Sequence, residues 1–457
     1  MGTRAVYSSL MGKRQKYHYP KSVPLFKFIW NAETIRKNPI PFHKKHFNAI
    51  GNTFSVRIGW KKYIILTRDA EVIKQILQKQ HTNFQKSDIQ TRYLSKYLGK
   101  GLLTSNGAHW LRQRRLIQPA FHKKKLDGLV VLIQKTIEQE LSGIPSQQAM
   151  DVFPLMNRLA FKVVATSLFD LSISEAQLVR LQYIIEEVQA FLVKELRVPH
   201  KKWWYKLSGQ MKHHLALAKE SRVIIQEIIE DRKASKNTHQ DLLEMLLDAR
   251  YEDSGAPMEM KQLIDEITIL FVAGHETTAN ALSFTYFLLA KHPAIQQKVL
   301  EEVTLVERGF PSGVEKIQQL PYTKAVIEEA MRLYPPAWIT DRASLKDASV
   351  GDYVLQSKTL IGISFYELHR NPEYWKDPDT FWPERFLERE KGTKDAYYPF
   401  GAGPRMCIGM GFALYEMILA VAFVVHRYHL STTLSEAKMN PLITLKPDGL
   451  EVTFTER

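Results

Sequence analysis

Near the N-terminus, hydrophobic and polar residues alternate along a short stretch of the chain. Phe54, Val56 and Ile58 stand at every second position, a turn follows at Gly59, and an apolar run resumes at Tyr63–Leu66. Alternation with a period of two places successive side chains on opposite faces of a strand. The pattern therefore predicts a β-hairpin in this part of the chain.

Most of the remaining chain shows the three-to-four-residue spacing of helices. From Leu126 onward, the apolar residues of one such stretch are Leu129, Val130, Ile133, Ile137 and Leu141. Similar patterns continue through residues 155–300, with breaks near Pro199 and at Gly255–Pro257. A long apolar helix is expected to begin near Leu263. These patterns predict a mainly helical protein.

Turn residues mark a second hairpin at the other end of the chain. Pro447-Asp448-Gly449 separates apolar runs at residues 442–445 and 450–454, which predicts a turn between two strands. Together, the periodicities indicate a mainly α fold with small β-sheets contributed by the two ends.

The length of the chain alone would allow about three domains at roughly 150 residues each. However, no Gly/Ser-rich linker, low-complexity segment or internal repeat divides the 457 residues. We therefore expect a single domain over residues 1–457, with residues 1–20 poorly ordered.

Cysteine usage and hydropathy limit the class of protein. One cysteine permits no intrachain disulfide and no cysteine-built zinc or iron–sulfur site, which favours a reducing compartment. No apolar run reaches the roughly 18 residues that a membrane span needs. The start of the chain, with Pro20 and Pro24, lacks a secretory apolar region. We therefore expect a cytoplasmic protein without a membrane span.

The net charge of +15, from 63 Lys and Arg against 48 Asp and Glu, gives the protein a basic surface. Such a surface attracts nucleic acid, anionic lipid or an acidic protein. Simple solubility also accounts for it, so the charge alone selects no partner.

The segment FGAGPRMCIG, residues 400–409, surrounds the cysteine. Gly401 and Gly403 permit backbone angles that let a tight loop lie against a flat ligand. A helical stretch follows Cys407, and the positive end of its dipole would lower the pKa of the thiol. Arg405 adds positive charge above the loop. A lone cysteine is usually buried and inert, but these neighbours favour a reactive thiolate.

The pattern Phe-Gly-x-Gly-x-Arg-x-Cys-x-Gly, followed by Phe412-Ala413 and Glu416, resembles the signature of the cytochrome P450 family at every fixed position. The resemblance implies haem b held by the sulfur of Cys407, a ligand that pushes electron density onto the iron and favours O–O cleavage. It also implies a single-domain cytochrome P450 fold, with the haem between two long helices that carry Thr277 and Cys407.

An acid and a base lie three residues apart at Glu329 and Arg332, on one helix face, and Tyr334-Pro335-Pro336 then ends that helix. Another arginine, Arg385, follows in the sequence WPERF. Alone, Glu-x-x-Arg would also suit a solvated helix. The resemblance implies instead that these three charged residues form a buried ion network that supports the cysteine loop.

The sequence AGHETT, residues 273–278, lies within the long apolar helix. Gly and Thr weaken a helix interior, and a glutamate there is costly unless it faces water or a partner. The stretch resembles the oxygen-activation groove of the family. This implies that Ala273 contacts the haem and that Glu276 and Thr277 deliver protons during oxygen activation. His275 falls at a variable position, and we expect it to be a packing or solvent residue.

Several further residues are implied as haem contacts. Trp110 and Arg114 are four residues apart and share a helix face, and the family pattern places them against a haem propionate. Arg342 and Arg405 resemble further propionate partners, so that three arginines would neutralise two carboxylates. Phe400 completes this set of cofactor contacts.

The resemblance implies a monooxygenase that consumes dioxygen, two electrons and a small organic substrate. The chain shows neither a flavin domain nor the cysteines of an iron–sulfur cluster. We therefore expect a separate acidic ferredoxin or flavodoxin, with its reductase, and no nucleic-acid partner. Arg112, Arg115 and Lys123–Lys125 could present a basic docking patch to it, although Arg112 and Arg115 are also typical of a solvated helix face.

Two other functions remain open for a haem protein of this kind. A peroxygenase takes peroxide and needs no electron donor, but that branch of the family typically lacks the acid–alcohol pair found at Glu276 and Thr277. A haem sensor without turnover needs no such pair and usually carries an output domain, which we do not find.

The substrate is only loosely constrained. The stretch RLYPPAW, residues 332–338, resembles bacterial members that oxidise fatty acids or carotenoids, and a terpenoid belongs to the same apolar class. Polar residues within 85–92 would instead suit O-demethylation of a small methylated sugar or an aromatic ether. Trp338 could stack on either kind of substrate, but a core tryptophan is the commoner role.

Overall fold

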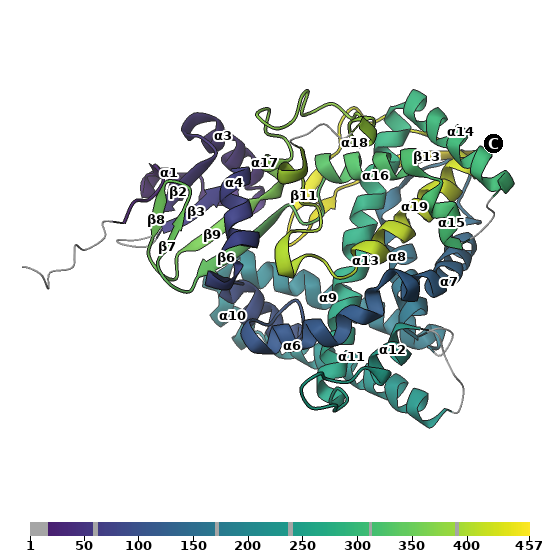
Figure 1. Ribbon diagram of the computed structural model, residues 1–457, viewed down its shortest axis with the longest axis horizontal. Helices are drawn as coiled ribbons and strands as arrows, with labels where there is room; N and C mark the ends of the chain where they lie inside the picture. Colours follow the sequence, from purple (N-terminus) through teal and green to yellow (C-terminus); the bar gives the residue numbers. More distant parts are fainter. Residues whose placement is uncertain (1–16, 58–62, 170–172, 236–240, 310–312, 389–392) are drawn as a thin grey trace, which may run out of the picture.

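The structure, a computed structural model, describes residues 17–57, 63–169, 173–235, 241–309, 313–388 and 393–457. Helices form most of it and the sheets are small (Figure 1), which confirms the predicted mainly α fold. The turn expected at Gly59 and residues 1–16 of the N-terminal segment lie outside the described residues. His18, within the segment expected to be poorly ordered, forms a β-bridge with Val354.

The longer helices of the described part are α3 (Ile40–Ile50), α6 (Gly107–Ile117), α7 (Lys123–Leu141), α8 (Val152–Phe169), α9 (Glu175–Arg197), α11 (Gln210–Ala234), α13 (Met260–Lys291), α14 (Pro293–Gly309), α16 (Pro321–Leu333) and α19 (Met410–Arg427). The shorter ones are α1 (Leu25–Trp30), α2 (Ala32–Lys37), α4 (Ala70–Lys74), α5 (Ser95–Leu98), α10 (Lys202–Leu207), α12 (Leu242–Asp248), α15 (Gly313–Gln318), α17 (Phe365–Leu368) and α18 (Arg385–Glu388).

The main hydrophobic core lies where α7, α8, α13, α16 and α19 meet. Helix α13 runs through the middle of the fold (Figure 1) and contacts α8, α11, α14, α16 and α19. A helix surrounded by other elements needs apolar residues on most of its circumference, and the second half of α13 is buried almost throughout. The predicted helices near Leu126 and Leu263 are confirmed as α7 and α13, and α9 ends just before Pro199, as expected.

The predicted N-terminal hairpin is confirmed and forms part of a larger sheet. Strands β2 (Thr53–Arg57) and β3 (Tyr63–Thr67) pair antiparallel, with Phe54 opposite Leu66. They belong to a six-stranded sheet in the order β1-β2-β3-β9-β6-β4. The other four strands are β1 (Ser22–Val23), β4 (Phe84–Gln85), β6 (Ile339–Ser344) and β9 (Leu360–Ser364).

The C-terminal hairpin was predicted wrongly in its pairing. The turn at Pro447-Asp448-Gly449 is present, but the strands on its two sides belong to different sheets. Strand β12 (Leu445–Pro447) pairs with β11 (Met439–Pro441), whereas β13 (Glu451–Glu456) lies between β10 (Tyr428–Ser431) and β5 (Ala149–Asp151). A further pair, β7 (Ala348–Val350) and β8 (Tyr353–Leu355), is isolated from these sheets.

Two helices, α8 and α19, are long and apolar enough to cross a membrane by length and composition. Within them, 72% and 56% of the residues are buried inside the fold. Both helices contribute side chains to the main core. Their hydropathy is therefore that of core helices, since the surface of each is largely covered by other elements.

Candidate functional site

The cysteine loop is a tight turn that leads into α19. Cys407 lies in the loop three residues before the helix begins, just ahead of the helical stretch that the sequence predicts. Its backbone N–H donates to the carbonyl of Phe400 at 2.9 Å, which closes the loop. Gly403 has a φ of 69°, and a Cβ there would lie 2.0 Å from the carbonyl oxygen of Leu77. Only glycine fits this position, because the angle and the close approach both exclude a side chain.

The sulfur of Cys407 is accessible to solvent although protein surrounds it on most sides. This burial raises the pKa of the thiol, whereas the backbone N–H of Gly409 and the charge of Arg114 lower it. The lowered thiol pKa expected from the helix dipole was therefore wrong for the protein without a bound metal, because desolvation outweighs the two favourable contributions. A bound metal ion would reverse this balance, since it deprotonates a coordinating thiol.

Helix α13 presents an accessible patch in the middle of its length. Ala273 is exposed although the residues before and after this turn of α13 are mostly buried. The Thr277 hydroxyl donates to the Ala273 carbonyl at 2.7 Å, one turn back, which is the local arrangement expected for a threonine inside a helix. His275 is buried with its ring edge-on to Phe161 at 5.4 Å, which confirms it as a packing residue.

Glu276 is partly buried and is bonded to a turn near the C-terminus. Its Oε1 accepts a hydrogen bond from the Thr444 hydroxyl, and Thr444 in turn accepts from Asn280 Nδ2 at 3.1 Å. Thr444 lies between β11 and β12. The carboxylate that the sequence places beside Thr277 is thus anchored to a segment far along the chain, which no local pattern indicates.

The predicted propionate contacts come together in space. The guanidinium of Arg405 lies over the ring of Trp110 at 4.1 Å. Arg114 donates to the carbonyl of Met406 at 3.0 Å, so α6 is bound directly to the cysteine loop. Burial and the nearby charge of Arg342 lower the pKa of Arg405 to about 10. The side chains of Trp110, Arg114, Arg342 and Arg405 therefore share one region, next to Cys407.

A buried lysine adds to this positive region, and the sequence analysis missed it. Lys86 donates to the carbonyls of Leu102 and Leu103 at 2.8 and 2.6 Å. Burial and the charges of Arg405 and Arg342 lower its pKa well below the usual range. Among the described residues, none of these three cations, nor Arg114, forms an ion pair with a carboxylate. No signal in the chain marks Lys86, because its neighbours come from distant segments.

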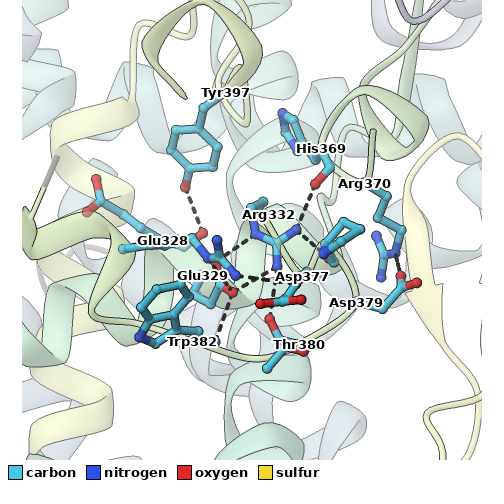
Figure 2. A network of polar contacts seen from close by, with 12 residues as sticks. Glu328, Glu329, Arg332, His369, Arg370, Asp377, Asp379, Thr380, Trp382 and Tyr397 are labelled. Carbon is cyan, nitrogen blue, oxygen red and sulfur yellow. Dashed lines mark hydrogen bonds and ion pairs between the residues drawn. The ribbon is translucent and has the colours of Figure 1, made fainter. Parts of the chain in front are cut away.

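The Glu329 and Arg332 side chains form the centre of a buried network, shown in Figure 2. The two groups make a bidentate ion pair, Nε to Oε2 at 2.7 Å and Nη2 to Oε1 at 2.8 Å, and both are completely buried. Arg385 donates to the same carboxylate at 3.2 Å. The remaining N–H groups of Arg332 donate to the carbonyls of His369, Pro378 and Thr380. The predicted ion network is confirmed.

His369 links this network to the chain ahead of the cysteine loop. Its carbonyl accepts from Arg332 at 2.7 Å, and its Nε2 accepts from the backbone N–H of Tyr398 at 2.9 Å. Burial and the charges of Arg332 and Arg370 hold the pKa of His369 well below its ordinary value, so the ring is neutral and can accept. The ion network thus supports the residues that lead to Phe400 and Cys407.

Only part of the expected basic docking patch has charges that are free of acidic partners within the described residues. Arg112 forms a bidentate pair with Asp253 at 2.9 and 3.0 Å, and Arg115 lies 3.8 Å from Glu252. These acids neutralise both arginines. Lys123–Lys125, at the start of α7, are exposed and form no ion pair within the described residues.

The residues present fit an iron porphyrin with two carboxylate groups. An accessible thiol in a rigid loop can bind the iron, and unpaired buried cations need the anionic charge that two propionates would supply. Cations buried without a counter-ion are otherwise costly. The fold and the site together define a haem-thiolate protein.

A family model described as cytochrome P450 matches residues 18–454. The chain therefore belongs to the cytochrome P450 family. It is similar to cyclooctat-9-en-7-ol 5-monooxygenase of Streptomyces melanosporofaciens, 32% identical over 90% of this chain and 88% of that one. It is also similar to cyclooctatin synthase of the same organism, 31% identical over 90% and 89%, and to a cytokinin hydroxylase of Arabidopsis thaliana, 30% identical over 91% and 84%.

The fold has the same family likeness. The crystal structure of the cytochrome P450DA heme domain superposes with a TM-score of 0.85 at 22% identity, covering 96% of this chain and 98% of that one. The predicted cytochrome P450 fold is thus confirmed. Membership of the family gives the chain a haem-thiolate cofactor, the chemistry of a monooxygenase, and a need for dioxygen, a substrate and a redox partner.

Proposed function

We propose that the protein hydroxylates a lipophilic terpenoid, with haem b bound through Cys407. The observation that carries the proposal is the accessible Cys407 thiol beside a region of cations that lack counter-ions. Haem held by a thiolate supplies the oxygen-activating chemistry when it is bound. Trp110, Arg114, Arg342 and Arg405 would hold the propionates, and Phe400 and Ala273 would contact the ring.

Within this proposal, Glu276 and Thr277 move protons. The Thr277 hydroxyl donates to the carbonyl of Ala273, and such a bond is expected to open a small polar notch in the helix beside the accessible patch. Glu276 holds its proton-transfer position through Thr444. The pair would pass protons from solvent to this notch, as the alcohol and the acid of a relay.

The relatives and the polar groups of the site support this substrate class. By their names, two relatives act on cyclooctat-9-en-7-ol and on echinocystic acid. Gln90, which could have favoured a polar substrate, donates to Asp341 at 3.0 Å instead. The Trp338 indole is buried and donates to the Leu442 carbonyl at 3.1 Å, so it serves as a core residue. The Gln90 amide and the Trp338 indole thus already have hydrogen-bond partners within the protein, and they do not favour a methylated sugar or a small ether as substrate.

We also propose that electrons come from an acidic ferredoxin or flavodoxin with its reductase. Lys123–Lys125 offer exposed charge for such a partner at the start of α7, close in sequence to α6, which contacts the cysteine loop. The lone cysteine, which needs to be kept reduced, supports a cytoplasmic location. The continuous core across α7, α8, α13 and α19 supports one domain over residues 1–457.

The experiment is a spectroscopic substrate titration of the haem-loaded protein. Cyclooctat-9-en-7-ol, a long-chain fatty acid and a methylated monosaccharide are added in separate titrations, and the spin-state shift of the Soret band is recorded. We expect the terpene alcohol to shift the band at the lowest concentration. A shift with the sugar alone would overturn the terpenoid assignment. Turnover with peroxide but not with a reduced ferredoxin would identify a peroxygenase, and turnover with neither would indicate a sensor.

A further inference from the structure

Two adjacent carboxylates at the start of α13 hold the loop between α5 and α6. Asp265 and Glu266 are 3% and 1% exposed. An oxygen of Asp265 accepts from the backbone N–H of Lys100 at 2.8 Å, and an oxygen of Glu266 accepts from the backbone N–H of Leu102 at 2.9 Å. Side chains of consecutive helical residues diverge by about 100°. The loop therefore has to follow the curve of the helix to meet both.

The loop approaches these carboxylates as closely as only glycine allows. A Cβ on Gly99 would lie 2.1 Å from an oxygen of Asp265, and one on Gly101 would lie 2.5 Å from an oxygen of Glu266. Gly99 also has a φ of 80°, in the left-handed region. Both glycines of this loop are thus explained by the contact with α13.

The far end of the loop holds the arginine of the cysteine motif. Arg405 donates to the carbonyl of Ser105 at 3.2 Å and to the side-chain oxygen of Asn106 at 3.1 Å. Between the two ends, the hydroxyl groups of Thr104 and Ser105 bond to the carbonyls of Gly99 and Gly101 at 2.7 and 2.6 Å. Movement of Gly99–Leu102 would therefore be transmitted to the groups that orient Arg405.

The charges around Glu266 come from several elements. Burial and, to a smaller extent, the charge of Asp265 raise the pKa of Glu266, whereas the N–H of Leu102, Gln262 and the charge of Lys86 lower it; the net pKa is about 7. Arg222, on α11, is paired with Asp265. Lys86 faces Glu266 from the segment before the loop, and burial and the charges of Arg405 and Arg342 lower its pKa well below the usual range. Among the described residues, Glu266 forms no ion pair with a cation, whereas its neighbour Asp265 does.

We propose that Asp265 and Glu266 form a pH-sensitive latch that keeps residues 99–106 closed against α13 and so keeps Arg405 in position. A carboxyl group whose pKa is raised in the closed form stabilises that form below its ordinary value of 4.5. This stabilisation is lost progressively as the pH rises from 4.5 to about 7. The released loop lets Glu266 become hydrated, so a rising pH favours release.

The test is hydrogen–deuterium exchange of the haem-loaded protein, followed by mass spectrometry of peptides that cover residues 99–106. Wild type and Glu266→Gln are compared at the same pH, so that the intrinsic pH dependence of exchange cancels. The neutral amide keeps an oxygen to accept from Leu102. Near pH 4, below the ordinary value of 4.5, Glu266 is protonated in both forms and we expect equal exchange. Near pH 8.5 the wild-type loop should exchange up to about a hundredfold faster than the variant.

Glu259→Gln is the matched control, because Glu259 is an exposed carboxylate at the start of the same helix. It should follow the wild type at both pH values. Equal exchange of wild type and Glu266→Gln near pH 8.5 would overturn the proposal. If Glu266→Gln fails to fold, the wild type alone decides. Protection of residues 99–106 must fall between the two pH values relative to peptides of α19, and unchanged relative protection would also refute the latch. The outcome is independent of the substrate.

Discussion

Replacing Glu329 by glutamine tests whether the buried ion network supports the haem site. The carboxylate accepts two hydrogen bonds from Arg332, one from Arg385 and one from the backbone N–H of Trp382. Glutamine has nearly the same shape but no charge. One of its oxygens becomes an NH2 group, which would point at N–H donors of the arginines.

The magnitude follows from the burial of the network. Arg332 is completely buried and Arg385 nearly so, and without Glu329 their charges would have no anionic partner within the described network. Breaking a buried pair in this way costs about 3–5 kcal/mol. A folded protein has only about 5–15 kcal/mol of stability in total. We therefore expect Glu329→Gln to be poorly folded and largely free of haem.

The assay is urea unfolding, together with the haem content of the purified protein. Urea is uncharged and does not screen ion pairs as a salt would. Glu220→Gln is the matched control, because Arg180 and Glu220 form a bidentate pair with the same atoms at 2.6 and 2.8 Å but on the surface, with 44% and 41% of the side chains exposed. The control should unfold like the wild type. A fully haem-loaded Glu329→Gln of wild-type stability would refute the argument.

Three further predictions concern the chemistry. Cys407→Ser should lose the long-wavelength Soret band of the reduced carbon-monoxide complex, and retention of this band would exclude Cys407 as the ligand. Thr277→Ala should keep haem and substrate binding while product per electron falls and peroxide rises, because only the hydroxyl at the notch is lost; equal coupling would make Thr277 a packing residue. Reversing Lys123–Lys125 to glutamates should slow reduction by an acidic ferredoxin at low salt, whereas Lys233→Glu, on the exposed end of α11, should not.

Local patterns in the sequence predicted where helices and turns form better than which elements pack or pair with one another. Helices α7 and α13 follow from apolar spacing, because a side chain every three or four residues defines a face without reference to the rest of the fold. The turn at Pro447–Gly449 was predicted for a similar reason. Its strands were assigned to one hairpin in error, because turn residues show where a chain reverses but not which strand it then joins.

In the functional site too, contacts between residues close in sequence could be predicted, whereas contacts made by the tertiary fold could not. Glu329 and Arg332 lie on one turn of a helix, so their pairing could be predicted. Lys86 comes close to Arg405 only through the tertiary fold, and nothing in its own segment distinguishes it from a surface lysine. The pKa of Cys407 was predicted in the wrong direction because a dipole is visible in the sequence, whereas desolvation depends on the surrounding chain.

The position of β13 bears on the order in which the protein folds. Asp151 pairs with Glu451 and Ser431 pairs with Thr453, so β5 and β10 gain their common neighbour only when the last strand has been synthesised. Contacts between such distant segments are slow to form, because the entropy cost of closing a long loop comes before the contacts add any stability. Helix α13 contacts both β10 and β13, so part of its apolar surface would stay uncovered on the ribosome until β13 has been synthesised. We expect nascent chains that end before β13 to bind chaperones and to be degraded readily.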